Sequence, residues 1–314
     1  MSNTHHAPPD GALTDPPTDQ ASETHTLRVL AADGAAADLL LICPASGAPR
    51  RLLYWLPAMG VPARHYLPLA QALAERGVAV ALHEWRGIGS SDRRAGWRQD
   101  WGYRELLACD LPAGLAAARE QLPHASCWLG GHSLGGQIAT LHASQHPAFA
   151  GLVLVASGAP YWRRFRQRWL ILAAYTAAPL LARLCGHLPG RRIGFGGNEA
   201  RGVVSDWARS GRSGRYTVTG TDRPWEQQLA ALALPVLALR LADDWLGPSP
   251  SLAWLLDKMP GAARQVIELT AAELDGPADH FSWMKAPAPV AAAIASWLVE
   301  QSGLEDRADG GTSC

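Results

Sequence analysis

The chain has 314 residues, enough for one large domain or two ordinary ones, and 48% of them are hydrophobic, which allows a substantial core. Its formal net charge is zero, so the overall charge does not point to nucleic acid or to an acidic partner. With 18% charged residues, the composition is that of a globular protein and excludes an intrinsically disordered chain.

The two ends of the chain are predicted to be disordered tails, over residues 1–25 and 303–314. The first of them contains four prolines, several acidic residues, no apolar run and no secretory signal. The chain has five cysteines, an odd number, and no C-x-x-C pair. We therefore expect reduced, mostly buried thiols in a cytoplasmic protein. The cysteines are Cys43, Cys109, Cys127, Cys185 and Cys314.

Short apolar runs of strand length recur between the tails. They are TLRVLA (26–31), DLLLIC (38–43), LLYWLP (52–57), VAVALHE (78–84), SCWLG (126–130), GLVLVAS (151–157), PVLALRLA (235–242) and QVIELT (265–270). After the first two, each run is followed by a longer segment, often with helical spacing, such as 62–76 and 103–122. This alternation predicts an α/β protein, with parallel strands buried on both faces and helical crossovers.

One interval between strands is too long for a simple crossover. More than seventy residues separate the runs at 151–157 and 235–242, whereas a crossover needs about a dozen. We predict a cap over residues 160–233, inserted into a core formed by 26–159 and 234–302. The cap contains a helical apolar run, Trp169 to Leu184, which is shorter than the roughly 20 residues that span a bilayer and is interrupted by Pro179. A cap helix packed on the core is favoured over a membrane anchor.

The predicted cap is strongly basic. Residues 161–223 contain twelve arginines and three acidic residues, which leaves nine formal positive charges in a chain of net charge zero. Trp162, Trp169 and Trp207 are interleaved with the arginines. Two interpretations remain open at this point. The arginines form a solvated surface, or they attract anionic substrates or an anionic lipid surface.

The stretch GHSLG (131–135) carries the clearest chemical signal. It is a G-x-S-x-G pattern that follows a predicted strand and precedes a predicted helix, which is the context of a nucleophile elbow. Such a turn exposes the Ser133 hydroxyl at the carboxyl edge of the sheet. Gly131 and Gly135 are expected beside it, because side chains there would collide with the turn. The alternative, a glycine turn with an incidental serine, leaves the flanking strand and helix unexplained.

A serine nucleophile needs a base, and the base needs an acid that orients it. In this architecture the chain order is nucleophile, acid, histidine. His280 is the only one of eleven histidines after residue 187, and it follows the last predicted strand, where a base must stand to reach the sheet edge. We therefore predict His280 as the base. His132 is adjacent to Ser133, but its place on the turn aims it elsewhere, and we expect it to serve packing.

The acid is expected after the strand at 235–242, where the sequence reads DDWLGP. Asp243 and Asp244 both qualify by position. Asp244 is favoured because it precedes Pro248 in a D-x-x-x-P pattern that is common after this strand, and Asp243 is then a loop residue or a neighbour of the site. Adjacent carboxylates can also indicate a metal site, but no His or Cys cluster supports one. We expect neither a metal nor another cofactor.

Acyl transfer also requires hydrogen-bond donors for the developing oxyanion. One predicted donor is the backbone N–H of Leu134, directly after the nucleophile. The second is predicted to be the N–H of Met59, in the loop after the third strand, where Gly60 eases the turn. The glycine-containing loop at 84–92 is expected near the same edge, either as part of the site or as a serine-rich turn without chemistry.

At these residues the chain resembles the α/β-hydrolase superfamily. GHSLGG resembles its elbow, EWRGIGSSD (84–92) is similar to its D-x-R-G-x-G-x-S loop, ADDWLGP resembles its acid loop and DHFSW its histidine loop. The resemblance covers about residues 26–302. It looks closest to bacterial hydrolases grouped with serine aminopeptidase S33-like and monoacylglycerol lipase-like proteins. Two positions depart from the pattern. Pro57 and Ala58 stand where the family often has an H-G pair, and Glu84 replaces the usual Asp.

The resemblance implies an α/β-hydrolase fold, with a mostly parallel central sheet flanked by helices and a helical cap inserted after the sixth strand. It also implies a serine hydrolase that acts on a carboxylic ester, a thioester or an amide through Ser133, His280 and Asp244 and an acyl-enzyme. One alternative is an acyltransferase of the same fold, in which an alcohol replaces water. The other is a non-enzymatic binding protein, which we would expect to have lost a triad member. The expected partner is a small acyl substrate, anionic or neutral, with no nucleic acid and no transmembrane segment.

Overall fold

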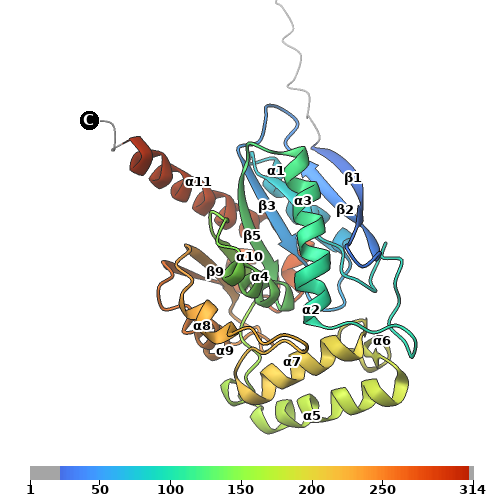
Figure 1. The fold of residues 1–314 in the computed structure, drawn as a ribbon. Helices are drawn as coiled ribbons and strands as arrows, with labels where there is room; N and C mark the ends of the chain where they lie inside the picture. Colours follow the sequence, from blue (N-terminus) through green and yellow to red (C-terminus); the bar gives the residue numbers. More distant parts are fainter. Residues whose placement is uncertain (1–21, 311–314) are drawn as a thin grey trace, which may run out of the picture.

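Eight strands form one mixed sheet in the computed structural model of the protein, which describes residues 22–310 (Figure 1). The strands are β1 (Glu23–Leu30), β2 (Ala36–Cys43), β3 (Arg51–Leu56), β4 (Ala79–Leu82), β5 (Ser126–His132), β6 (Leu152–Val155), β9 (Val236–Leu241) and β10 (Arg264–Leu269). Their order across the sheet is β1-β2-β4-β3-β5-β6-β9-β10. The β1–β2 and β2–β4 pairs are antiparallel and all others are parallel. Each apolar run that predicted a strand forms one, and the α/β fold is confirmed.

The two faces of the sheet bury alternate residues, because successive side chains of a strand point in opposite directions. In β3, Leu52 and Tyr54 belong to one apolar cluster, whereas Leu53 and Trp55 belong to another. None of these four side chains is exposed to solvent. Helices cover both faces, which is why the central strands are continuous apolar runs with no alternation of polar residues.

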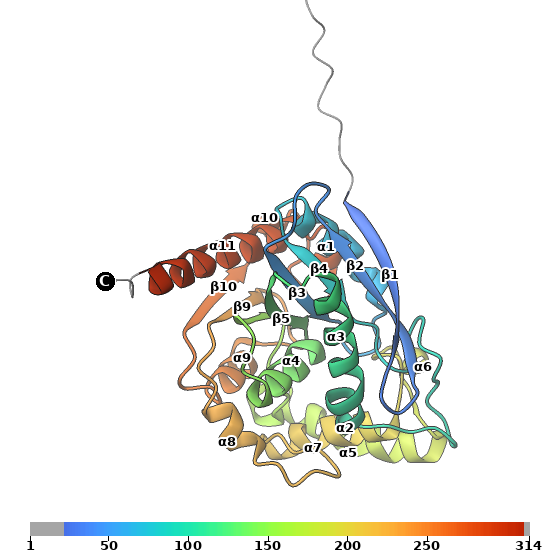
Figure 2. The same ribbon diagram turned by 45° about the horizontal axis from the view of Figure 1, so that its top comes forward.

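Helices α3, α4 and α9 contribute to the cluster on one face, and α1 and α11 contribute to the cluster on the other (Figures 1 and 2). The helix predicted over 103–122 forms as α2, a π-helical turn over 106–110, and α3. The helices outside the long insertion are α1 (Leu67–Ala74), α2 (Tyr103–Glu105), α3 (Leu111–Gln121), α4 (Leu134–Gln145), α9 (Ser249–Leu256), α10 (Ala271–Leu274) and α11 (Ala288–Gly310).

Residues 160–233, the insertion between β6 and β9, are mainly helical. They form α5 (Arg168–Cys185), α6 (Gly190–Ile193), α7 (Arg201–Ser213) and α8 (Trp225–Ala230), with a short pairing of β7 (Leu188–Pro189) and β8 (Asn198–Glu199). α7 lies between α5 and the rest of the protein, so α5 is the outermost helix of the insertion (Figure 1). Asp206 of α7 is fully buried and accepts the Tyr103 N–H at 3.0 Å, which ties the insertion to the start of α2.

The ordered elements extend further at both ends than the sequence predicts. β1 begins at Glu23 and not after residue 25, because residues 23–25 pair with the end of β2. α11 continues to Gly310, past the predicted boundary at Gly303. A single glycine costs a helix only about 1 kcal/mol, and no proline follows to end it. The rest of both predicted tails, 1–21 and 311–314, lies outside the described residues.

Between residues 22 and 310, no helix has both the length and the apolar character needed to cross a membrane. The apolar run at Trp169–Leu184 is part of α5. Cys43, Cys109, Cys127 and Cys185 are free thiols. Cys127 is buried and the other three are half-buried, so the expectation of mostly buried thiols is wrong for the described cysteines, and Cys314 lies outside the described residues.

Candidate active site

Ser133 lies at the junction of β5 and α4, in the turn that GHSLG predicts. Its backbone has φ 55° and ψ −117°, a conformation that residues other than glycine rarely adopt. The Ser133 N–H donates to Val155 O at 3.1 Å, which anchors the turn to β6. A Cβ on Gly135 would lie 2.0 Å from Leu56 O, and one on Gly131 would lie 2.5 Å from the Gly135 carbonyl carbon. Close backbone approach therefore requires glycine at both positions, and the turn presents a partly exposed serine.

His280 and Asp244 form a buried pair. His280 Nδ1 lies 2.7 Å from Asp244 Oδ2, and the two residues are only 6% and 4% exposed. Asp244 Oδ1 accepts the backbone N–H groups of Leu246 at 2.8 Å and Gly247 at 2.9 Å, which fix the carboxylate. Since Nδ1 is held by Asp244, Nε2 is the ring nitrogen that remains for proton exchange with a neighbouring group.

The loops that carry these side chains meet at one edge of the sheet. β5, β9 and β10 belong to the parallel part of the sheet, and Ser133, Asp244 and His280 follow their carboxyl ends. The ring centroid of His280 is 4.8 Å from that of His132, the residue directly before Ser133. The structure therefore brings His280 and Asp244, two of the predicted site residues, into contact, and it brings both beside the elbow.

Asp243 is separated from this pair. Its backbone N–H donates to Ala278 O at 3.0 Å, and its exposed carboxyl makes no hydrogen bond or ion pair within residues 22–310. The two adjacent aspartates thus face different surroundings, because Asp243 lies exposed in the turn that follows β9, whereas Asp244 is buried against His280. Over the same residues, no group of three or more His, Cys, Asp or Glu side chains is arranged to hold a metal ion.

A single hydroxyl links the loop after β3 to the elbow. Tyr66 Oη accepts the Ala58 N–H at 2.9 Å and lies 2.8 Å from His132 Nδ1. Burial, with a smaller effect of His280, holds the pKa of His132 well below its usual value, so its ring is neutral. Burial also raises the pKa of Tyr66, so its hydroxyl stays protonated and donates a hydrogen bond to His132 Nδ1. His132 is fully buried, as expected of a packing residue, but nothing in the sequence indicates its partner Tyr66.

Within residues 22–310, neither of the two backbone N–H groups predicted as oxyanion donors has a competing acceptor. Leu134 is the first residue of α4, so its N–H has no partner inside the helix. The Met59 N–H donates to no acceptor in the described part of the chain. Gly60 has φ 74°, and a Cβ there would lie 1.9 Å from Gly197 N. The insertion therefore packs directly on the Met59–Gly60 loop.

Glu199 supports this contact from inside the insertion. Its Oε1 accepts the Gly197 N–H at 3.0 Å, and the residue is 8% exposed. Burial raises the pKa of Glu199 to about 7. The sequence contains no sign of this residue's position, because it depends on how the insertion folds back on the core.

Two exposed aromatic side chains follow the paired residues directly. Trp245 comes after Asp244 and is 56% exposed, and Phe281 comes after His280 and is 46% exposed. The Phe281 ring centroid lies 4.7 Å from that of His280, in an edge-to-face arrangement. Apolar surface is therefore available at the rim of this site.

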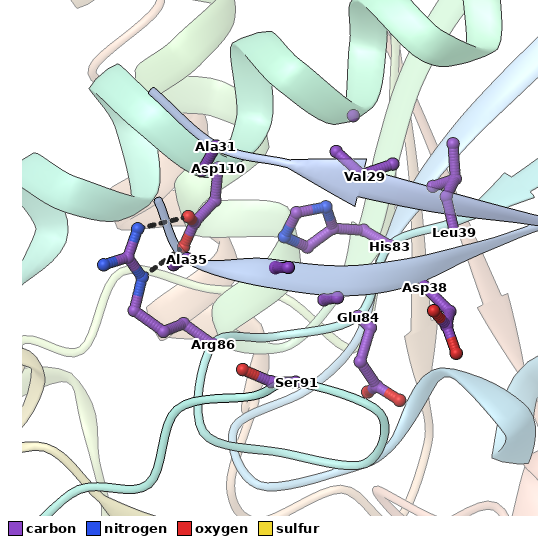
Figure 3. Close-up of a pocket in the computed structure, with 13 residues that line it drawn as sticks. Val29, Ala31, Ala35, Asp38, Leu39, His83, Glu84, Arg86, Ser91 and Asp110 are labelled. Carbon is purple, nitrogen blue, oxygen red and sulfur yellow. Dashed lines mark hydrogen bonds and ion pairs between the residues drawn. The ribbon is translucent and has the colours of Figure 1, made fainter. Parts of the chain in front are cut away.

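A small cavity of about 30 Å³ lies elsewhere, between the β1–β2 hairpin and the segment that follows β4 (Figure 3). The His83 ring points into it, and at its margin Arg86 Nε donates to Asp110 Oδ2 at 3.0 Å. Burial lowers the pKa of His83 to about 3, so its ring is neutral. None of the predicted site residues lines this cavity, whose volume suits about one water molecule.

The loop at 84–92 has a structural role in this arrangement. Glu84 accepts the Ala63 N–H at 3.0 Å and the Ser90 N–H at 3.2 Å, and a Cβ on Gly89 would meet Glu84 Oε2 at 1.8 Å. The carboxylate therefore holds its own loop against the segment before α1.

The model of the family described as serine aminopeptidase, S33, matches residues 47–209, just over half of the chain. No curated protein sequence matches the chain.

Solved structures of other proteins share the fold. An esterase from Pyrococcus furiosus is 16% identical, with 96% of this chain and 99% of that one covered and a TM-score of 0.57. The esterase domain of a Rhodothermus marinus protein is 16% identical, with 88% and 97% covered and a TM-score of 0.57. A monoacylglycerol lipase from Paleococcus ferrophilus is 16% identical, with 89% and 99% covered and a TM-score of 0.56. At these identities the likeness establishes the fold, which is that of the α/β-hydrolases.

Proposed function

The chain belongs to the serine aminopeptidase S33 family of hydrolases, and we propose that it is a serine hydrolase that cleaves a carboxylic ester through Ser133, His280 and Asp244. The observation that carries the proposal is the buried contact of 2.7 Å between His280 Nδ1 and Asp244 Oδ2, at the same sheet edge as a serine held at φ 55°. A strained serine turn and a fixed imidazole–carboxylate pair have no evident structural purpose unless the serine reacts.

The roles follow from the chemistry of each group. Ser133 Oγ attacks the ester carbonyl while His280 Nε2 takes the hydroxyl proton, and the Asp244 carboxylate stabilises the resulting imidazolium. The bond from the carbonyl carbon to the alkoxy oxygen then breaks, and the leaving alcohol receives the proton from His280. Water attacks the acyl-enzyme by the same route and releases the acid and free Ser133.

The developing negative charge is expected to be stabilised by the backbone N–H groups of Leu134 and Met59. Both are free of acceptors in the described residues, and Leu134 also opens α4, whose N-terminus favours negative charge. The insertion acts in this proposal as a cap, because Gly197 presses on Gly60 and thereby sets the position of the Met59 N–H.

A neutral ester with an apolar group fits the surroundings better than a highly polar substrate. Trp245 and Phe281 present exposed aromatic surface beside Asp244 and His280, where an acyl chain or an aromatic alcohol can pack. Thioesters and amides can follow the same chemical route, and so can transfer of the acyl group to an alcohol.

A fluorophosphonate probe tests the proposal, since it labels only an activated serine. We expect labelling of the wild-type chain, no labelling of Ser133→Ala, and strong reduction in His280→Ala. Ser144→Ala is the matched control, because Ser144 lies on α4 and donates only to Leu141 O. A folded wild-type chain that does not react would favour the non-enzymatic alternative.

A substrate panel then separates the remaining reactions. Aryl esters of increasing acyl length, a thioester and an aminoacyl anilide are compared by kcat/KM, with and without an added alcohol. A higher kcat/KM for the anilide than for the esters would mean that the enzyme cleaves an amide and not an ester. An alcohol-dependent acyl product at the expense of free acid would indicate acyl transfer.

A further inference from the structure

The outer face of α5 is an apolar surface that the rest of the protein leaves uncovered. This helix has 18 residues, of which only Tyr175 and Ala182 are fully buried. Leu170 is 67% exposed, Leu180 55% and Leu184 77%. At 1.5 Å per residue the helix is about 27 Å long, and its exposed apolar residues extend along most of that length. An apolar patch of this extent on a protein surface marks an interaction site.

Tryptophans lie at both ends of this face. Near the start of α5, Trp169 is 64% exposed and stacks on Trp162 with 5.0 Å between ring centroids. At the other end, Trp97 from a distant loop is 65% exposed, and its ring lies against Gly186, where a Cβ would be 3.0 Å from the indole. Exposed Ile193 follows shortly after on α6. Amphipathic tryptophan rings are typical of surfaces that lie at the boundary between water and lipid.

Arginines gather at both ends of this face, although one of them, Arg164, stacks on Trp254 of α9. Four arginines stand between Trp162 and Trp169, and Arg191 and Arg192 stand beside Ile193. Within the described residues these arginines form no ion pair with a carboxylate, and residues 147–198 contain no Asp or Glu. An uncovered apolar helix between two unpaired basic clusters is complementary to a surface that offers both hydrocarbon and negative charge.

We propose that this surface, formed by the outer face of α5 with Trp97, Trp162, Ile193 and the flanking arginines, docks the protein on an anionic phospholipid membrane. α5 lies in the plane of the interface, its leucines enter the boundary between headgroups and acyl chains, and the arginines bind lipid phosphates. The helix is not a membrane span, since no described helix meets that requirement. This inference goes beyond the proposed function and does not depend on it.

Charge selects the membrane over a second copy of the chain. A symmetric dimer through α5 would place arginines of one copy against arginines of the other, whichever direction the helices take, because both ends are basic. No acidic residue from 147 to 198 is present to neutralise them. An anionic bilayer supplies the missing negative charge and covers the apolar face at once.

Vesicle sedimentation of the full chain tests the proposal, with phosphatidylcholine vesicles and with vesicles that also contain phosphatidylglycerol. We expect binding to the anionic vesicles to be at least about tenfold tighter and to weaken as salt is raised. The double variant Leu170→Gln/Leu184→Gln should bind roughly tenfold more weakly or worse, since it removes apolar surface from the contact. Arg191→Gln/Arg192→Gln should weaken binding only to the anionic vesicles and reduce its salt dependence.

The matched control is Leu30→Gln/Val266→Gln, which removes two exposed apolar side chains from the edge strands β1 and β10, 69% and 51% exposed. This variant should bind like the wild type, and a soluble ester should be hydrolysed equally by all variants without vesicles. Absence of wild-type binding to anionic vesicles, or equal loss in the control, would overturn the proposal. So would a concentration-dependent dimer that the α5 variants abolish, or salt-sensitive cleavage of soluble anionic esters without vesicle binding.

Discussion

Two apolar helices of this protein have opposite surroundings. α4 has 12 residues and buries ten of them, from Leu134 to Ala143, between the sheet and the insertion. α5 is longer, with 18 residues, and fully buries only Tyr175 and Ala182, where it packs on α7. In sequence both are apolar segments of helical length, and α5 has the longer uninterrupted apolar stretch.

The difference shows that apolar composition indicates burial only where a partner surface exists. α4 follows the elbow directly. It packs on β3, β5 and β6 and against the loop after β3, so its side chains are covered by other parts of the chain. α5 lies outside α7 and has this helix as its main partner, on one side (Figure 1). The candidate catalytic serine therefore stands at the start of the buried helix α4, and the candidate docking surface is the uncovered face of α5.

The largest effect is expected at the start of α4. Ser133→Ala should lower kcat for a short-chain aryl ester by roughly 10⁴- to 10⁶-fold and leave the melting temperature almost unchanged, because the removed hydroxyl is not part of the core. His280→Ala should behave similarly, and the double variant should be no worse than either single variant, since the two groups act together. Near-wild-type turnover by folded Ser133→Ala would show that Ser133 is not the nucleophile and that GHSLG is only a structural turn.

The two adjacent aspartates give the next largest contrast. Asp244→Asn should lower kcat by about 10⁴-fold, because the imidazole loses its orienting carboxylate. Asp243→Asn should stay within a few-fold of the wild type, since its exposed carboxyl contacts neither His280 nor the elbow. Steady-state kinetics of both variants measure the difference, and a reversed order would assign the acid to Asp243.

Truncation of one side chain on each helix tests the comparison itself. Ile138→Ala on α4 should lower the free energy of unfolding by roughly 2–5 kcal/mol, because Ile138 is fully buried and a cavity remains. Leu180→Ala on α5 should change it by no more than about 0.5 kcal/mol, because Leu180 is 55% exposed. Urea denaturation provides both values. A comparable loss in the two variants would mean that α5 is covered in solution.

Glu199 lies where the insertion contacts the Met59–Gly60 loop, and its ionisation should make the free energy of unfolding depend on pH. Its folded-state pKa is about 7, above the ordinary value of 4.5, because burial disfavours the charged form. The unfolded chain therefore loses this proton first, so the contribution of Glu199 to the free energy of unfolding falls as pH rises from 4.5 to 7 and changes little above that. Glu199→Gln removes the effect but keeps an acceptor for the Gly197 N–H.

We expect Glu199→Gln to become more stable than the wild type by roughly 2–3 kcal/mol at pH 8 relative to their difference at pH 4.5. Urea unfolding at several pH values measures this. The matched control is Glu273→Gln, whose exposed carboxyl caps α10. Parallel pH profiles for Glu199→Gln and the wild type would show that Glu199 is ionised in the folded protein.

The sequence by itself determined the elements of the core and their order. The continuous apolar runs between helical segments indicate the buried parallel strands at the centre of the sheet, although β1 and β2 form antiparallel pairs and β1 is largely exposed. The G-x-S-x-G pattern at a strand–helix junction places Ser133 in a strained turn, because glycines on both sides permit close backbone approach. The position of His280 after the last strand also follows from chain order. These features are local, so neighbouring residues specify them.

Only the tertiary structure decided the features that depend on distant segments. The sequence favours Asp244, but its contact with His280 depends on how two loops meet, and the link from Ala58 through Tyr66 to His132 depends on three separate segments. The burial of Glu199 and the exposure of α5 depend on where the insertion folds back. Hydrophobic periodicity predicts that a helix has an apolar face, but whether another part of the chain covers that face is settled only when the whole chain has packed.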